Sequence, residues 1–130
     1  MRHAHRISGE SPFAYAQRLA QEKALAIAAG LDSQSTTIGC DTIVILGDDV
    51  LEKPSDTADA EKMLTRLSGN RHLVCTALAL AEQDGWIICG HDVTAVYLKS
   101  FTRDQIRDYI ATGEPMDKAG SYGIQGMGAF

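Results

Sequence analysis

An aspartate and a lysine flank a predicted hairpin in the first half of the chain. Residues 38–46 are mostly apolar and β-branched, which predicts a buried strand, and Val50-Leu51 begins a short return strand. Asp41 lies near the start of the first strand and Lys53 follows the second, so the hairpin is expected to bring both toward the same end of the sheet. An ionised carboxylate inside an apolar run is costly unless it is paired or holds a metal. Asp41 beside Lys53 would suit phosphate chemistry, with a structural ion pair as the alternative.

A second lysine is expected on the packed face of a helix over residues 12–29. Ser11 is a typical N-cap, proline suits the first helical position, and Gly30 is a suitable end. Lys23 shares its stripe with apolar side chains, namely Tyr15, Leu19 and Ala26. A lysine in this position either extends to the edge of the helix or points into a site.

The remaining pattern indicates an α/β domain. Helices are expected from Asp56 or Thr57 to Ser68-Gly69 and from the capping box Thr102–Gln105 to Thr112-Gly113. Strands are expected at residues 72–81, with both faces covered, and at 86–99, joined by an Asp-Gly turn. Because hairpins and helices alternate, the sheet is predicted to be mixed rather than purely parallel.

Two segments carry further polar candidates. His91-Asp92 interrupts the long return strand, so His91 is expected at the surface and Asp92 is a candidate second acid near Asp41. The turn-rich segment 114–130 holds Asp117, Lys118 and Gln125 among several glycines. Glycines allow a backbone to approach a ligand closely, although surface loops are also often rich in glycine.

Composition limits the classes of function. The 130 residues are 45% apolar and 22% charged, which is ordinary for a soluble globular domain. The net charge of -5 and the absence of a basic face argue against nucleic-acid binding, and no apolar run is long enough for a membrane span. Three unclustered cysteines (Cys40, Cys75 and Cys89) are interpreted as buried free thiols, which predicts a cytoplasmic protein.

Five motifs in order resemble the Maf family of nucleoside triphosphate pyrophosphatases. They are Arg18-Leu-Ala-Gln-Glu-Lys-Ala24, Cys40-Asp-Thr-Ile-Val44, Leu51-Glu-Lys-Pro54, Leu67-Ser-Gly69, and Gly113-Glu-Pro115 continued by Asp117-Lys-Ala-Gly120 and Tyr122-Gly-Ile-Gln-Gly126. The resemblance implies one Maf-like domain over residues 1–130, with a mixed sheet, packed helices and a fold similar to the inosine triphosphate pyrophosphatases. It also implies hydrolysis of a nucleoside triphosphate to the monophosphate and pyrophosphate.

The same resemblance implies roles for individual residues. Asp41 matches the family's acid, which is expected to be either a ligand of the divalent metal, Mg²⁺ or Mn²⁺, or the general base. Lys23 and Lys53 match phosphate-contacting lysines, and Thr42 adjoins the acid on the base or sugar side. Gln125 resembles the dTTP/UTP subgroup, since the branch that prefers 7-methyl-GTP or CTP has glutamate there.

Other implied features concern Lys118, the partners and the ends of the chain. Lys118 is either another phosphate contact or a structural partner. The expected partners are a nucleoside triphosphate and a second copy of the chain, without nucleic acid or membrane. The family's Ser-x-Ser-Pro-Arg-Arg motif, the acidic residues that normally precede Gly9–Pro12 and the last helix have no counterpart here. We therefore expect an incomplete Maf-like domain, which is either a truncated form or is completed by another copy of the chain. A catalytically impaired nucleotide-binding or cell-division regulatory relative is therefore the alternative function.

Overall fold

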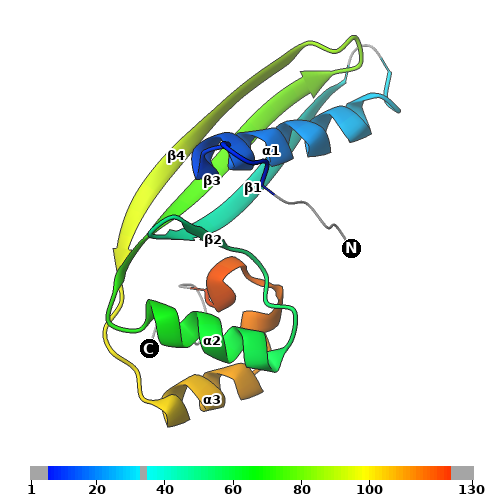
Figure 1. The fold of residues 1–130 in the computed structure, drawn as a ribbon. Coiled ribbons are helices and arrows are strands. Elements are labelled where there is room, and N and C mark those ends of the chain that lie inside the picture. Colours follow the sequence, from blue (N-terminus) through cyan, green and yellow to red (C-terminus); the bar gives the residue numbers. More distant parts are fainter. Residues whose placement is uncertain (1–5, 33–34, 124–130) are drawn as a thin grey trace. The chain divides into compact units, whose positions relative to one another are not determined.

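The computed structural model describes residues 6–32 and 35–123 and confirms the α/β class (Figure 1). The four described strands form one antiparallel sheet in the order β2-β1-β3-β4, so no parallel pair of the expected mixed sheet occurs among them. The elements are, in chain order, α1 (Pro12–Ala28), β1 (Thr36–Leu46), β2 (Asp49–Leu51), α2 (Thr57–Leu67), β3 (Arg71–Glu82), β4 (Ile87–Tyr97), α3 (Arg103–Ala111) and two 3₁₀ turns, Glu114–Asp117 and Ala119–Ser121.

The three predicted helix starts are confirmed at the residue. Ser11 and Asp56 cap α1 and α2 by accepting backbone N–H groups in the first turn. Thr102 begins α3 with a complete capping box, in which the Gln105 side chain returns to the Thr102 N–H. These hydrogen bonds satisfy N–H donors that a helix start otherwise leaves unpaired. Because they depend only on neighbouring residue types, the sequence was enough to predict the three helix starts.

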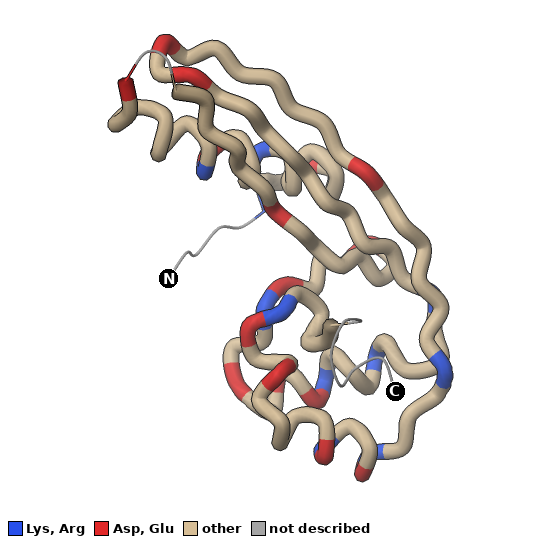
Figure 2. Tube along the Cα trace, turned by 180° about the vertical axis from the view of Figure 1, so that it is seen from behind, with Lys and Arg blue, Asp and Glu red and all other residues tan. Residues whose placement is uncertain are grey.

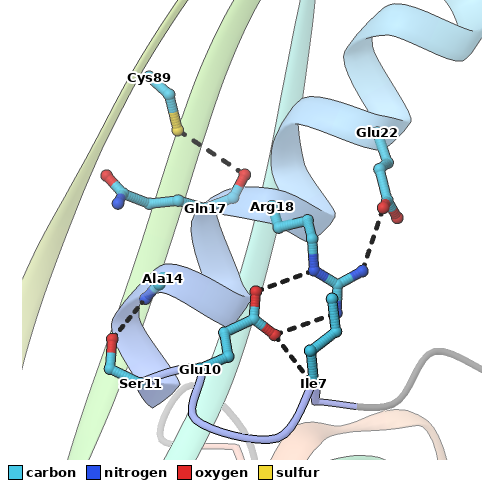
Figure 3. A network of polar contacts seen from close by, with 8 residues as sticks. All are labelled: Ile7, Glu10, Ser11, Ala14, Gln17, Arg18, Glu22 and Cys89. Atoms are coloured by element: carbon cyan, nitrogen blue, oxygen red, sulfur yellow. Dashed lines mark hydrogen bonds and ion pairs between the residues drawn. The ribbon is translucent and has the colours of Figure 1, made fainter.

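A partly buried ion pair between Glu10 and Arg18 also holds the start of α1 (Figure 3). Glu10 accepts two hydrogen bonds from the Arg18 guanidinium, at 2.9 Å and 3.1 Å, and one from the Ile7 N–H at 3.1 Å. Arg18 also bonds Glu22 one turn further along the helix, at 3.1 Å. The hydrogen bond from Arg18 lowers the pKa of Glu10 below its ordinary value. The residue 7–10 turn is therefore attached to the helix that follows it.

The residues form two compact units, each described here by itself. One unit comprises Met1–Thr42 and Cys75–Val93, and the other comprises Ile43–Val74 and Thr94–Phe130. Strands β1, β3 and β4 each contribute residues to both units. The single domain expected over residues 1–130 stays a prediction.

In the first unit α1 packs closely on one face of the sheet. The backbone of Gly39 in β1 lies so near Ala20 and Ala24 that an added Cβ would come within 2.4 Å of the Ala20 carbonyl oxygen. The opposite face is open, since Leu78 is 52% exposed and Ile38 is 67% exposed. The expectation that both faces of β3 are covered is therefore wrong for this part of the strand, where Cys75 and the alanines are buried on one face and Leu78 is exposed on the other.

The second unit has its own apolar core beneath α2 and the 3₁₀ turns. Val44, Leu51 and Leu67 are buried there and are surrounded by partly buried apolar side chains. The predicted hairpin is confirmed, and its register places Val44 opposite Leu51. Charged residues are frequent on α2 and α3 and sparse along the strands (Figure 2). Within residues 6–32 and 35–123, none of the helices has the length and apolar character required to cross a membrane.

Candidate active site

Asp41 forms an ion pair with Lys23 in the first unit. Lys23 Nζ lies 2.5 Å from Asp41 Oδ1 and 3.3 Å from the carbonyl oxygen of Cys40. The aspartate is 9% exposed, whereas the lysine side chain is 41% exposed. The small residues of α1 and Gly39 of β1 permit the close approach of helix and strand that this contact needs. Lys23 is thus directed at a carboxylate and a carbonyl oxygen, and whether it points into a substrate site stays a prediction.

The donor chemistry at Asp41 suits a metal that is shared with a substrate. Mg²⁺ is commonly bound by one or two carboxylates together with substrate phosphates and water, rather than by a complete protein cage. No group of three His, Cys, Asp or Glu side chains that could hold a metal occurs in the described part of the chain. One carboxylate beside an ammonium group fits the first arrangement and does not fit a structural zinc site.

Thr42 lies on the opposite face of β1 from Asp41. Adjacent residues of a strand point to opposite faces, and burial in β1 alternates accordingly, with Asp41 buried and Thr42 exposed. The Thr42 hydroxyl lies 3.3 Å from that of Thr76 in β3, within hydrogen-bonding distance. Any contact of Thr42 with a substrate would therefore come from the other side of the strand.

In the second unit the backbone near Lys118 is hydrogen-bonded to the backbone near Lys53. The Gly120 N–H donates to the carbonyl oxygen of Glu52, the residue before Lys53, at 3.1 Å. Lys118 lies 3.9 Å from the Asp117 carboxylate, and its aliphatic carbons pack against the backbone of Gly123. Gln125 lies outside the described residues. The expected proximity of Asp41 and Lys53, which belong to different units, stays a prediction.

A buried histidine that sequence reasoning missed contacts this loop. His72 Nε2 lies 2.6 Å from the Tyr122 hydroxyl, and the two rings meet edge to face at 5.4 Å. Burial lowers the pKa of His72 and raises that of Tyr122. His72 is 1% exposed, and its Nδ1 has no hydrogen-bond partner among the described residues. Strict alternation along β3 places His72 and Cys75 on opposite faces, yet both are buried. The alternation of the sequence therefore did not indicate that His72 is buried.

The other polar candidates lie along β3 and β4. His91 is exposed, as expected, and stacks on Phe13 at 5.4 Å. Asp92 is exposed in β4, which β3 separates from β1 in the sheet. Burial, and secondarily Asp41 and Asp92, raise the pKa of the Cys75 thiol.

The prediction of three buried thiols is correct only for Cys75, which is fully buried. Cys40 is exposed because it lies on the open face of β1, and Cys89 at the edge of the sheet is intermediate. An apolar sequence neighbourhood could not distinguish the covered face of this sheet from the open one. Disulfides do not occur among these three cysteines.

Comparison with known proteins supports the resemblance found in the motifs. The family model described as "Maf-like protein" matches residues 2–130. The chain is 50% identical over 120 residues to a dTTP/UTP pyrophosphatase of Yersinia pestis, covering 92% of this chain and 60% of the relative. It is 48% identical over 123 residues to a protein of the same name from Pectobacterium atrosepticum, covering 95% of this chain and 62% of the relative.

A third relative, from Vibrio cholerae and also named dTTP/UTP pyrophosphatase, is 45% identical over 126 residues, which are 95% of this chain and 65% of that protein. The chain thus spans about 60% of the length of the curated relatives it matches. The family match covers nearly every residue, including the segments of Lys23, Asp41, Lys53 and Lys118. The chain belongs to the Maf-like protein family.

Proposed function

We propose that this chain carries a nucleoside triphosphate pyrophosphatase activity that converts dTTP or UTP to the monophosphate and pyrophosphate. The observation that carries the proposal is the identity of 45–50% to several relatives named dTTP/UTP pyrophosphatase, over more than 90% of the chain. The Lys23–Asp41 pair supplies a chemical basis, because it joins a nearly buried carboxylate to a cation in one place.

The proposed reaction assigns two roles to Asp41 and one shared role to the three lysines. Mg²⁺ or Mn²⁺, when bound at Asp41 with the phosphates, would neutralise phosphate charge and lower the pKa of a coordinated water. Asp41 accepts the proton as the water oxygen attacks the α-phosphorus, and the bond from that phosphorus to the bridging oxygen breaks. Lys23, Lys53 and Lys118 hold the phosphate oxygens, so that charge developing on pyrophosphate is stabilised as it leaves.

The base preference is assigned to side chains that can read a pyrimidine edge. A glutamine amide both donates and accepts hydrogen bonds, as a uracil or thymine edge requires, and Gln125 is proposed for this role by family resemblance. Thr42 is proposed to lie on the base or sugar side of the substrate. Because Thr42 and Asp41 lie on opposite faces of β1, this assignment requires that the substrate reach both faces of the strand.

We also propose a cytoplasmic homodimer as the working form of the protein. Both features come from the family resemblance, and the free thiols agree with a reducing compartment. Nucleic acid and membrane are not proposed as partners, because a chain with a net charge of -5 is not expected to present the extended basic surface that either would require. Sedimentation equilibrium over a tenfold concentration range should give twice the monomer mass of 14.0 kDa. A mass that stays at the monomer value would contradict the dimer.

The test of the reaction is the identity of its products. The chain is incubated separately with dTTP, UTP and CTP in the presence of Mg²⁺ or Mn²⁺, and the phosphorus species are followed by ³¹P NMR. Expected are equal amounts of monophosphate and pyrophosphate from dTTP and UTP, with slower reaction of CTP and none after metal chelation. Release of orthophosphate and the nucleoside diphosphate would contradict the proposed bond cleavage. Binding of dTTP without any product would instead indicate the impaired nucleotide-binding relative.

A further inference from the structure

A buried contact outside the acid and lysine set determines how the Lys118 loop is held. We propose that His72 and Tyr122 are a positioning pair that fixes residues 118–123, and with them Lys118, in the conformation that receives the substrate phosphates. The proposal rests on the proposed function for its substrate. The contact is short, at 2.6 Å, and joins residues fifty positions apart in the sequence.

The loop is held at each of its last four residues. Besides Tyr122, the Ser121 hydroxyl donates to Met63 Sδ at 3.1 Å, the Gly120 N–H to the Glu52 carbonyl oxygen at 3.1 Å, and the Gly123 N–H to the Tyr109 hydroxyl at 3.0 Å. Contacts of this number on a short turn-rich segment are unusual for a surface connection. They indicate that one conformation of the loop is selected.

The backbone of the loop is strained where it is held. Ser121 is the one non-glycine residue with positive φ in the described part of the chain, at 67°, and it is fully buried. Gly120 also has positive φ, and an added Cβ would lie 2.8 Å from Val44. A side chain in the left-handed region persists only where surrounding contacts compensate for the strain, and such residues cluster at functional sites.

The histidine itself is placed at a cost that simple packing does not explain. Burial lowers the pKa of His72 and raises that of Tyr122, so it favours the neutral imidazole and the protonated phenol. Either the Tyr122 hydroxyl donates to Nε2, or Nε2 donates to the hydroxyl oxygen. In both tautomers Nδ1 lacks a hydrogen-bond partner among the described residues. An apolar residue at position 72 would avoid the unsatisfied Nδ1, but it would also remove this hydrogen bond from the Tyr122 hydroxyl. The hydrogen bond to Tyr122 is the specific contribution of a histidine here.

The link from the pair to Lys118 is direct. The aliphatic carbons of Lys118 pack against the backbone of Gly123, the residue after Tyr122, and a Cβ at Gly123 would lie 2.8 Å from Lys118 Cδ. Tyr122 thus fixes the surface against which the lysine stem lies. If the loop loosens, Lys118 loses its support and Nζ samples many positions, so binding of the phosphates weakens.

The first test measures loop opening without reference to activity. Trypsin cleaves after Lys118 only when the loop is open, and mass spectrometry gives the rate at this bond, with cleavage after Arg103 and Arg107 as internal references. Tyr122→Phe, which removes the hydroxyl alone, should raise cleavage after Lys118 by about tenfold. His72→Gln, which keeps a hydrogen-bonding side chain, should raise it less. The matched control Tyr97→Phe removes an exposed hydroxyl and should change nothing.

The second test connects the loop to substrate. Tyr122→Phe should raise the KM for dTTP by about tenfold with a smaller change in kcat. Added to Lys118→Ala it should have little further effect, because both changes remove the same phosphate contact. Additive effects of the two changes, a uniform rise in cleavage at all sites, or wild-type cleavage after Lys118 in Tyr122→Phe would overturn the proposal. If the unmodified chain hydrolyses no nucleotide, the proposed function fails, and the cleavage rates alone decide whether the pair positions the loop.

Discussion

At the scale of single residues, the Lys23–Asp41 contact combines features that composition and periodicity could not reveal. The carboxylate is almost buried and the ammonium is half exposed, so Lys23 compensates the charge of Asp41 while remaining open to water. A buried charge that loses its partner is destabilising, whereas exposed ion pairs contribute little. This pair lies between the two limits.

Replacement of Lys23 tests that balance. Lys23→Met keeps the aliphatic stem and removes Nζ, and we expect the free energy of unfolding to fall by about 1 kcal/mol, measured by urea denaturation. Lys62→Met on the exposed face of α2 is the matched control and should leave stability nearly unchanged. The double variant Lys23→Met/Asp41→Asn should recover part of the loss. Equal losses in Lys23→Met and Lys62→Met would show that the pair has no net effect.

At the scale of elements, the packing of α1 on β1 places the ion pair. Both members stand on regular structure, Lys23 in the middle of the helix and Asp41 in the middle of the strand. The helix presents alanines to the strand, and Gly39 gives the space that lets the two backbones approach. The position of the acid therefore depends on a glycine two residues away.

Gly39→Ala should disturb this packing. The added Cβ would meet a backbone carbonyl at 2.4 Å and the Cβ of Ala24 at 2.9 Å, neither of which can rotate away. The expected loss is about 1–3 kcal/mol of unfolding free energy by urea denaturation, as for other overpacked cores. Gly90→Ala in β4 meets no atom within 4 Å and serves as the control, with a change of less than about 0.5 kcal/mol. Similar losses at both positions would contradict the close approach.

The turn before α1 should respond to acid through Glu10. Its folded pKa lies below the ordinary value of 4.5, chiefly because of the Arg18 hydrogen bond, so its contribution is present above that value and is lost as pH falls through the folded pKa. Glu10→Gln should therefore flatten the fall of stability with acid below about pH 4.5. The check is urea denaturation at several pH values between 3 and 6. An unchanged slope in the variant would show that Arg18 does not stabilise the ionised form.

At the scale of the whole molecule, the sequence was most informative where structure is local. The caps at Ser11, Asp56 and Thr102 and the hairpin that follows Leu46 were predicted because each depends on contacts within a few residues. The burial of His72 was not, since it depends on Tyr122, which lies fifty residues later.

Long-range contacts also explain the other gaps in the prediction. The Lys23–Asp41 pair needed the placement of α1 on β1, which no periodicity specifies. The two exposed faces of β1 and β3 in the first unit were not foreseen, because an apolar strand has the same sequence pattern whether one face or both are covered. Family motifs supplied the candidate residues, and the fold shows which of them meet.

The overall charge of the chain makes the lysines necessary for the proposed activity. With a net charge of -5, the protein as a whole repels a nucleoside triphosphate, so attraction must come from local cations and a bound metal. Asp41 is proposed to hold that metal and to accept the proton of water. The central claim is therefore that hydrolysis depends on this carboxylate.

The most direct test compares pyrophosphate release from dTTP by the unmodified chain, by Asp41→Asn and by the control Asp49→Asn. Asp41→Asn keeps the size of the side chain but removes its charge, and kcat/KM should fall by at least about 10²-fold. Asp49 is an exposed aspartate paired with Arg66, and its replacement should leave kcat/KM nearly unchanged. Circular dichroism of each variant verifies folding. Turnover of dTTP that persists in folded Asp41→Asn would contradict the account.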